Sequence, residues 1–261
     1  MASLPGAAAL TEPMRAALLG LAPDIYSAEL RRLRAGAKEA ALELLADPVV
    51  GAMVDRLPLR PGARVLAFGD SHTSDPQSWG AILNEMLAVR RPMDGISIDV
   101  SAVAGETTTH GLIRMGGVIA RNPDWILFFI GVNDARTQGP APSKTLVALE
   151  ETARNFEELR NRVSRETKSR CLWVTPPPVL EDCVSKHGGL SCFGVRFRNE
   201  DIARVAEVIA AFDEPVINLF ESLGLSPSRE LFMEDGLHFT LEGQKRIALE
   251  VVRGWSDGRA R

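Results

Sequence analysis

Residues 64–71 read RVLAFGDS, an apolar run that ends in the polar turn Gly69-Asp70-Ser71. Short apolar runs of this kind are typical of strands in a parallel sheet, because helices bury both faces of such a sheet. A polar turn at the carboxyl end of such a strand lies where α/β proteins bind their ligands. This stretch therefore predicts the first strand of an α/β domain and a functional loop directly after it.

Further apolar runs lie at residues 96–100, 125–130, 171–175 and 215–219. Between and after them, apolar side chains recur every three or four residues, which indicates amphipathic helices. These helices are expected over about residues 149–163, 202–212 and 241–255, with Thr240 as the N-cap of the last. Alternating strands and helices predict βαβ units, and five strands fit a flavodoxin-like, doubly wound, three-layer parallel sheet in the order 2-1-3-4-5.

Residues 1–60 do not follow this alternation. They contain two stretches of helical period, and the second places apolar side chains on one face: Leu30, Leu33, Ala37, Ala41 and Leu44. The proline- and glycine-containing stretch 57–62 indicates a linker before the first strand. We therefore expect a helical N-terminal extension over residues 1–60 and the main domain over residues 61–261. A lid, a dimer surface and simple packing are all open roles for the extension.

Composition excludes several classes of protein. A chain of 261 residues, with 25% charged and 45% hydrophobic residues, is typical of one globular domain with an appendage. The net charge of −4 argues against nucleic-acid binding. The apolar runs are much shorter than the roughly 20 residues of a membrane span. Three cysteines and an N-terminus without a basic leading segment favour the cytoplasm, with a mature secreted form as the alternative.

Polar loops follow three of the predicted strands. They are Gly69-Asp70-Ser71-His72-Thr73, Ala104-Gly105-Glu106-Thr107 and Gly131-Val132-Asn133-Asp134. In the order 2-1-3 the first strand lies between the second and the third, so these loops should converge on one crevice. Asp235 and His238 lie three residues apart just before the last helix, and one turn can bring both side chains to the same crevice.

These residue types can perform acyl transfer. A serine hydroxyl becomes a useful nucleophile beside a base, and the base needs an orienting partner; Ser71, His238 and Asp235 supply these roles. The oxyanion needs preorganised donors, which the backbone N–H groups of Ser71 and Gly105 and the side-chain amide of Asn133 provide. Each residue alone has a simpler role as a helix cap, a turn residue or a structural histidine. Those simpler roles do not predict four such groups at strand ends in this order.

As an ordered set, the four blocks resemble those of the SGNH hydrolases, also called GDSL-type hydrolases. Gly69-Asp70-Ser71, Gly105, Gly131-Val132-Asn133-Asp134 and Asp235-Gly236-Leu237-His238 carry the resemblance, which spans residues 64–255. It implies the SGNH hydrolase fold and metal-independent esterase, lipase, thioesterase or carbohydrate-deacetylase activity. It also implies Ser71 as nucleophile, His238 as base, Asp235 as its orienter, and Ser71, Gly105 and Asn133 as the oxyanion hole. His72 departs from the family, because a leucine commonly follows the serine.

Other interpretations remain open at this point. A flavin-binding module could hold a phosphate with Ser71, Thr73 and Ser74, although it would not explain Asp235 and His238. Cys183, His187 and Cys192 could hold a metal with Cys171 as fourth ligand, or Cys183 and Cys192 could form a disulfide. An O-acyltransferase would use the same catalytic residues. Our leading expectation is an esterase acting on small-molecule, short-acyl esters, with no cofactor and a possible homodimer through the N-terminal helices.

Overall fold

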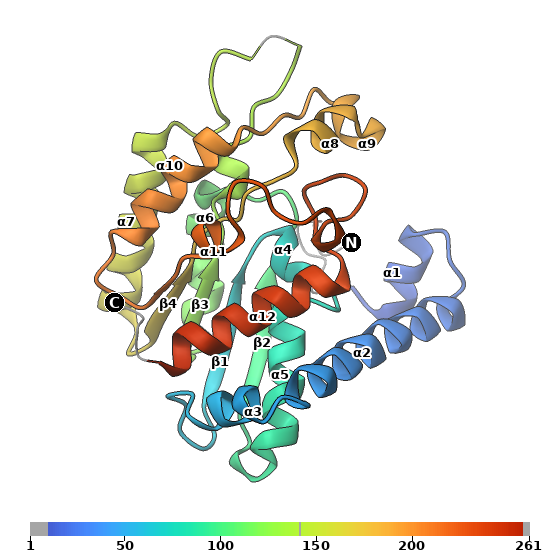
Figure 1. The fold of residues 1–261 in the computed structure, drawn as a ribbon, viewed down its shortest axis with the longest axis vertical. Coiled ribbons are helices and arrows are strands. Elements are labelled where there is room, and N and C mark those ends of the chain that lie inside the picture. The colour runs from blue at the N-terminus through green and yellow to red at the C-terminus, as the bar shows by residue number, and fades with distance from the viewer. Residues whose placement is uncertain (1–9, 141, 258–261) are drawn as a thin grey trace.

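The computed structural model describes residues 10–140 and 142–257, and its centre is a five-stranded sheet (Figure 1). The strands are β1 (Arg64–Gly69), β2 (Ser97–Ala102), β3 (Trp125–Phe129), β4 (Arg170–Val174) and β5 (Val216–Ile217). Their order across the sheet is β2-β1-β3-β4-β5, and every neighbouring pair is parallel. The predicted α/β sheet and its strand order are confirmed.

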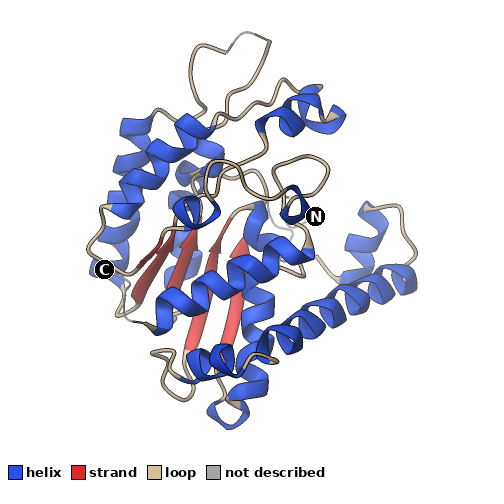
Figure 2. Cartoon of the chain, viewed as in Figure 1, coloured by secondary structure: helices blue, strands red, loops and turns tan. Residues whose placement is uncertain are grey.

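Helices cover both faces of the sheet, so the molecule has three layers (Figure 2). One face packs against α2 (Pro23–Leu45), α3 (Pro48–Asp55), α5 (Trp79–Arg90) and α12 (Leu241–Ser256). The other face packs against α6 (Thr108–Ile119), α7 (Leu149–Glu166) and α10 (Asn199–Ala210). Successive side chains of β1 point to opposite faces of the sheet. Val65 and Ala67 lie in the hydrophobic core on the first face, and Leu66 and Phe68 lie in the core on the second.

Short helices occupy the connections. They are α4 (Ser71–Ser74), α8 (Glu181–Lys186), α9 (Gly188–Ser191) and α11 (Leu219–Leu223). Thr240 caps α12 as predicted, because its hydroxyl accepts a hydrogen bond from the Gly243 N–H at 3.2 Å. No helix within the described ranges combines the length and apolar character that crossing a membrane requires.

The two edge strands differ from their predicted form. In β2, Asp99 and Val100 are exposed, because an edge strand lacks a neighbour on one side and is covered less completely. The run predicted at 215–219 forms only a two-residue strand. Asn218 ends it by accepting a hydrogen bond from the Glu221 N–H at 3.2 Å, which starts α11 at Leu219.

The N-terminal region contains three helices where two stretches were expected: α1 (Glu12–Leu18), α2 and α3. The long helix α2 ends at Leu45, and Asp47 then caps α3 by accepting a hydrogen bond from the Val49 N–H at 2.8 Å. The second half of α2 is buried against the sheet-covering helices at Ala37, Ala40 and Ala41, whereas α1 and the start of α2 project from the body (Figure 1). The stretch 57–62, which was predicted to be a linker, packs against the body of the protein, since Leu57 and Leu59 are buried.

We predict that deleting residues 1–55 removes cooperative folding or lowers the melting temperature by more than about 10 °C, because part of the core is lost. Deleting only residues 1–21, which include α1, should leave the melting temperature within a few degrees of wild type. Thermal unfolding of both variants checks this. A changed acyl-chain preference in the shorter deletion, with unchanged stability, would instead make α1 part of the substrate site.

Candidate active site

Ser71 lies directly after β1, at the carboxyl edge of the sheet. The preceding Asp70 is the N-cap of α4, and its Oδ1 accepts a hydrogen bond from the His72 N–H at 3.1 Å. The helix-cap role at this turn therefore belongs to Asp70 and not to Ser71. Among the described residues, neither the hydroxyl nor the backbone N–H of Ser71 has a hydrogen-bond partner. Both groups are thus available to a ligand.

Gly105 and Asn133 come to the same edge from the neighbouring loops. Gly105 has a φ of +80°, a conformation that favours glycine, and its N–H donates to no described residue. The buried Asn133 amide donates from Nδ2 to the Glu106 carbonyl oxygen at 3.1 Å and lies 3.4 Å from Asp70 Oδ2. One side chain therefore connects the turn after β1, the loop after β2 and the turn after β3.

The neighbouring Asp134 is a structural anchor. Its buried carboxylate accepts hydrogen bonds from the Thr108 N–H at 2.9 Å, from the Thr108 hydroxyl, and from the Thr152 hydroxyl at 3.1 Å. Burial raises the pKa of Asp134 to about 6, although these hydrogen bonds act in the opposite direction. The carboxylate thus ties the starts of α6 and α7 to the turn that carries Asn133.

Asp235 and His238 form a close pair before α12. Asp235 Oδ2 and His238 Nδ1 are 2.6 Å apart, and Asp235 Oδ1 accepts the N–H groups of Leu237 and His238, each at 2.9 Å. Burial raises the pKa of Asp235, but the hydrogen bonds from His238 outweigh it and bring the pKa down to about 2. Burial lowers the pKa of His238, but the hydrogen bond and charge of Asp235 outweigh it and raise that pKa above its usual value.

Glycine at position 236 allows the tight turn between these two residues. Gly236 has a φ of +70°, and a Cβ there would lie 2.5 Å from Cys183 Cβ and 2.8 Å from the Leu180 carbonyl oxygen. The Gly236 carbonyl oxygen in turn accepts a hydrogen bond from the Leu180 N–H at 2.9 Å. The Asp-Gly-Leu-His segment is therefore held against the chain that enters α8.

The turn that carries Ser71 and this pair lie close together but are not hydrogen-bonded. The structure has no hydrogen bond between Ser71 and His238, although such bonds are often long in free enzymes and tighten with substrate. The rings of His72 and His238 have centroids 6.0 Å apart, and the nearby Asp70 charge helps raise the pKa of His238. The His238 side chain is 34% exposed and therefore accessible from solvent.

The ordered blocks and this geometry agree with a family comparison. Residues 67–246 match the model of the GDSL-like Lipase/Acylhydrolase family, which is more than half of the chain. The chain belongs to this family. The predicted membership is confirmed, and the protein is an ester hydrolase. No match was found among curated protein sequences.

Solved structures support the GDSL-like fold at low sequence identity. Axe2, an acetylxylan esterase from Geobacillus stearothermophilus, aligns with a TM-score of 0.57 and 18% identity, over 76% of this chain and 95% of its own. LAE5, described as an alpha/beta hydrolase from the metagenome of Lake Arreo, Spain, has a TM-score of 0.56, 20% identity and coverage of 76% and 97%. TesA has a TM-score of 0.54, 19% identity and coverage of 73% and 97%.

Sequence reasoning missed Arg114 in this GDSL-like site. From within α6, its guanidinium donates to the Glu106 carboxylate at 2.5 Å, to Ser101 Oγ at 3.1 Å and to the Gly69 carbonyl oxygen at 3.2 Å. It also lies over the Phe68 ring, 4.5 Å from the centroid. Arg114 therefore joins the ends of β1 and β2 to the loop of Gly105. A single arginine in an amphipathic helix carries no motif that could have revealed this.

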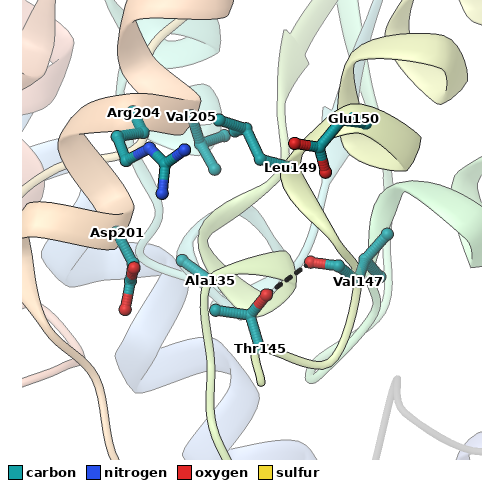
Figure 3. Close-up of a pocket in the computed structure, with 8 residues that line it drawn as sticks. All are labelled: Ala135, Thr145, Val147, Leu149, Glu150, Asp201, Arg204 and Val205. Atoms are coloured by element: carbon teal, nitrogen blue, oxygen red, sulfur yellow. Dashed lines mark hydrogen bonds between the residues drawn. The ribbon is translucent and has the colours of Figure 1, made fainter. Parts of the chain in front are cut away.

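The alternative sites find no support in the geometry. The three cysteines are free thiols, so Cys183 and Cys192 form no disulfide. Within residues 10–140 and 142–257, no group of three His, Cys, Asp or Glu side chains could hold a metal. A cavity of about 110 Å³ lies between α7, α10 and residues 135 and 145–147. Figure 3 shows its lining, in which the Thr145 hydroxyl donates to the Val147 carbonyl oxygen at 2.7 Å. None of the five predicted site residues lines it.

Proposed function

We propose that the protein is a serine esterase that hydrolyses short-acyl carboxylic esters through an acyl-enzyme on Ser71. The observation that carries this proposal is the 2.6 Å contact between His238 Nδ1 and Asp235 Oδ2. It assigns the Nδ1 hydrogen to the side facing the carboxylate and leaves Nε2 as an acceptor. Acyl transfer requires a base in that tautomer near a serine hydroxyl that is not already engaged in another hydrogen bond.

The steps follow from these groups. His238 Nε2 takes the hydroxyl proton while Ser71 Oγ bonds to the ester carbonyl carbon, and the carbonyl oxygen becomes an oxyanion. The Ser71 and Gly105 N–H groups donate to this oxyanion. The Asn133 amide joins them by giving up its long contact with Asp70 Oδ2, at 3.4 Å. The C–O bond to the alcohol then breaks, and His238 gives its proton to the leaving alkoxide. Water attacks the acyl-enzyme with His238 again as base, which releases the carboxylic acid and restores Ser71.

Carbohydrate acetyl esters are the favoured substrate class within this proposal, since a structurally similar protein is described as an acetylxylan esterase. An O-acyltransferase would use the same residues and pass the acyl group to an alcohol instead of water. A panel of aryl esters of increasing chain length, a thioester and acetylated xylo-oligosaccharides tests the class, with Ser71→Ala as control. Product analysis with and without added alcohol separates the hydrolase from the transferase.

The pH dependence should report the base. His238 must be neutral to accept a proton, and its pKa is raised, so kcat/KM should increase with pH through a midpoint above 6.5 and then level off. In Asp235→Asn the midpoint should move to lower pH and kcat should fall by about 10²–10⁴-fold, because the charge and the tautomer control are lost. NMR titration of the His238 ring is the matching measurement, since burial raises the pKa of Asp70 to about 7 and its ionisation also contributes to the profile. An unchanged midpoint in Asp235→Asn would mean that ionisation of His238 does not control the pH dependence of kcat/KM.

Substitutions at the neighbouring residues Asn133 and Asp134 should have different effects, one on catalysis and the other on stability. Asn133→Ala should lower kcat by about 10²–10³-fold with KM nearly unchanged, because an oxyanion donor acts mainly in the transition state. Asp134→Ala should instead lower the free energy of unfolding by about 3 kcal/mol, because it leaves buried threonine and backbone donors without a partner. Kinetics and melting temperature of both variants check this. A destabilised but fully active Asn133→Ala variant would return that residue to a turn-forming role.

A homodimer and a cytoplasmic location remain proposals as well. The projecting α1 and the start of α2 expose Met14, Leu18 and Ile25, each more than half accessible, which supports a contact with a second copy. Sedimentation of the full chain beside the 1–21 deletion tests the dimer. The free thiols are compatible with a reducing compartment.

A further inference from the structure

His72, the residue that departs from the family pattern, is fully buried beside the proposed nucleophile. Its ring stacks on Phe129 at a centroid distance of 5.5 Å and contacts the edges of Phe239 and His238 at 5.4 and 6.0 Å. The side chain is 1% exposed, so it does not point into solvent. It therefore fills the space between the end of β3 and the segment that carries the proposed base.

The hydrogen bonding of His72 fixes its tautomer. Its Nε2 lies 3.0 Å from the Leu237 carbonyl oxygen, which can only accept, so Nε2 carries the hydrogen. Its Nδ1 makes no hydrogen bond and lies 3.7 Å from Asp70 Oδ1. Burial lowers the pKa of His72 to about 4, and the charge of His238 acts in the same direction. The ring is consequently a neutral donor under ordinary conditions.

The Leu237 carbonyl belongs to the peptide group that precedes the Cα of His238. The same peptide group donates its N–H to Asp235 Oδ1 at 2.9 Å. It is thus held on one side by His72 and on the other by Asp235. His72 is also bonded directly to Ser71, and its own carbonyl accepts from Gln244 Nε2 at 3.3 Å. One residue and one hydrogen bond therefore connect the chain at Ser71 to the chain at His238.

We propose that His72 is a positioning residue: its Nε2–H holds the Leu237–His238 peptide and so sets the place of His238 relative to Ser71. This inference rests on the proposed function of those two residues. A leucine at position 72 could fill the same space but could not donate. The neutral imidazole supplies both the packing and the donor, which a purely apolar core residue would not.

The test compares glutamine and asparagine at position 72. Both keep a polar amide at the site, but their side chains differ in length. In His72→Gln the amide nitrogen falls near the place of Nε2, whereas in His72→Asn it falls near the place of Nδ1 and does not reach the Leu237 carbonyl. We expect His72→Asn to lower kcat by about 10–100-fold with KM nearly unchanged, since misplacing a catalytic group by about 1 Å has effects of this size. His72→Gln should recover to within about 3-fold of wild type. His72→Leu should behave like His72→Asn if it folds.

Each outcome has a separate meaning. Equal kcat values for His72→Gln and His72→Asn, counted per folded molecule by circular dichroism, would overturn the positioning role and leave His72 as packing. The positioning role would also be overturned if KM and melting temperature changed in both variants while kcat did not differ between them. Ser71→Ala, assayed in the same series, keeps the two proposals apart. Its near-wild-type activity would refute the proposed function itself, whatever the His72 variants do.

Discussion

Replacing Ser71 with alanine should lower kcat for ester hydrolysis by about 10⁴-fold or more, with a nearly unchanged melting temperature. The loss is large because Ser71 alone forms the acyl-enzyme in the proposed mechanism, and the residual rate would come from substrate binding and the oxyanion donors alone. The fold should tolerate the change, because the Ser71 hydroxyl makes no hydrogen bond to a described residue and Asp70 carries the cap of α4. Initial rates on an aryl acetate and thermal unfolding of one preparation measure both effects.

Ser74→Ala is the matched control for this experiment. Ser74 lies in the same four-residue helix and is also partly exposed, so its loss tests for a general disturbance of α4. We expect kcat within about 3-fold of wild type for this control, as for a surface change that touches no reacting group. Comparable activity losses in the two variants would indicate damage to the helix and not removal of a nucleophile.

Replacing His238 with alanine should have an effect of similar size, about 10⁴-fold or more on kcat, because the hydroxyl then has no base. The double variant with Ser71→Ala should be hardly less active than either single variant, since the two residues act as one unit. His187→Ala, between α8 and α9, is the control for loss of an imidazole elsewhere in the chain. Additive losses in the double variant would mean that Ser71 and His238 serve different steps.

The sequence predicts the sheet because its strands are short, continuous apolar runs with strong helical periods between them. Strand ends are less visible, since the run at 215–219 is apolar throughout but Asn218 redirects the backbone into α11. The same limitation hides α3, whose start depends on the Asp47 cap and Pro48 more than on periodicity. The apolar pattern thus identifies elements, while single polar residues decide where they begin and end.

The candidate site divides in the same way. Ser71, Gly105 and Asn133 follow strand ends, so topology predicts that their loops converge. Asp235 and His238 are visible through their spacing just before the last helix. Arg114 and His72 could not be interpreted from sequence, because their roles depend on which carbonyl groups lie within reach. Their partners Gly69 and Leu237 are respectively 45 and 165 residues away along the chain. Such contacts are determined by packing: the sequence marks His72 only as a departure from the family's usual leucine and gives no signal for Arg114.

The most direct test of the central claim is chemical labelling of the nucleophile. A fluorophosphonate ester, which phosphonylates activated serine hydroxyls, is added to the wild-type protein, and the modified residue is located by peptide mass spectrometry. We predict one phosphonyl group per chain, on the peptide that contains Ser71, with activity lost in proportion; Ser71→Ala should not be labelled, and His238→Ala should be labelled far more slowly. Stoichiometric labelling of another residue, or full ester hydrolysis by a protein whose Ser71 is completely modified, would contradict the account.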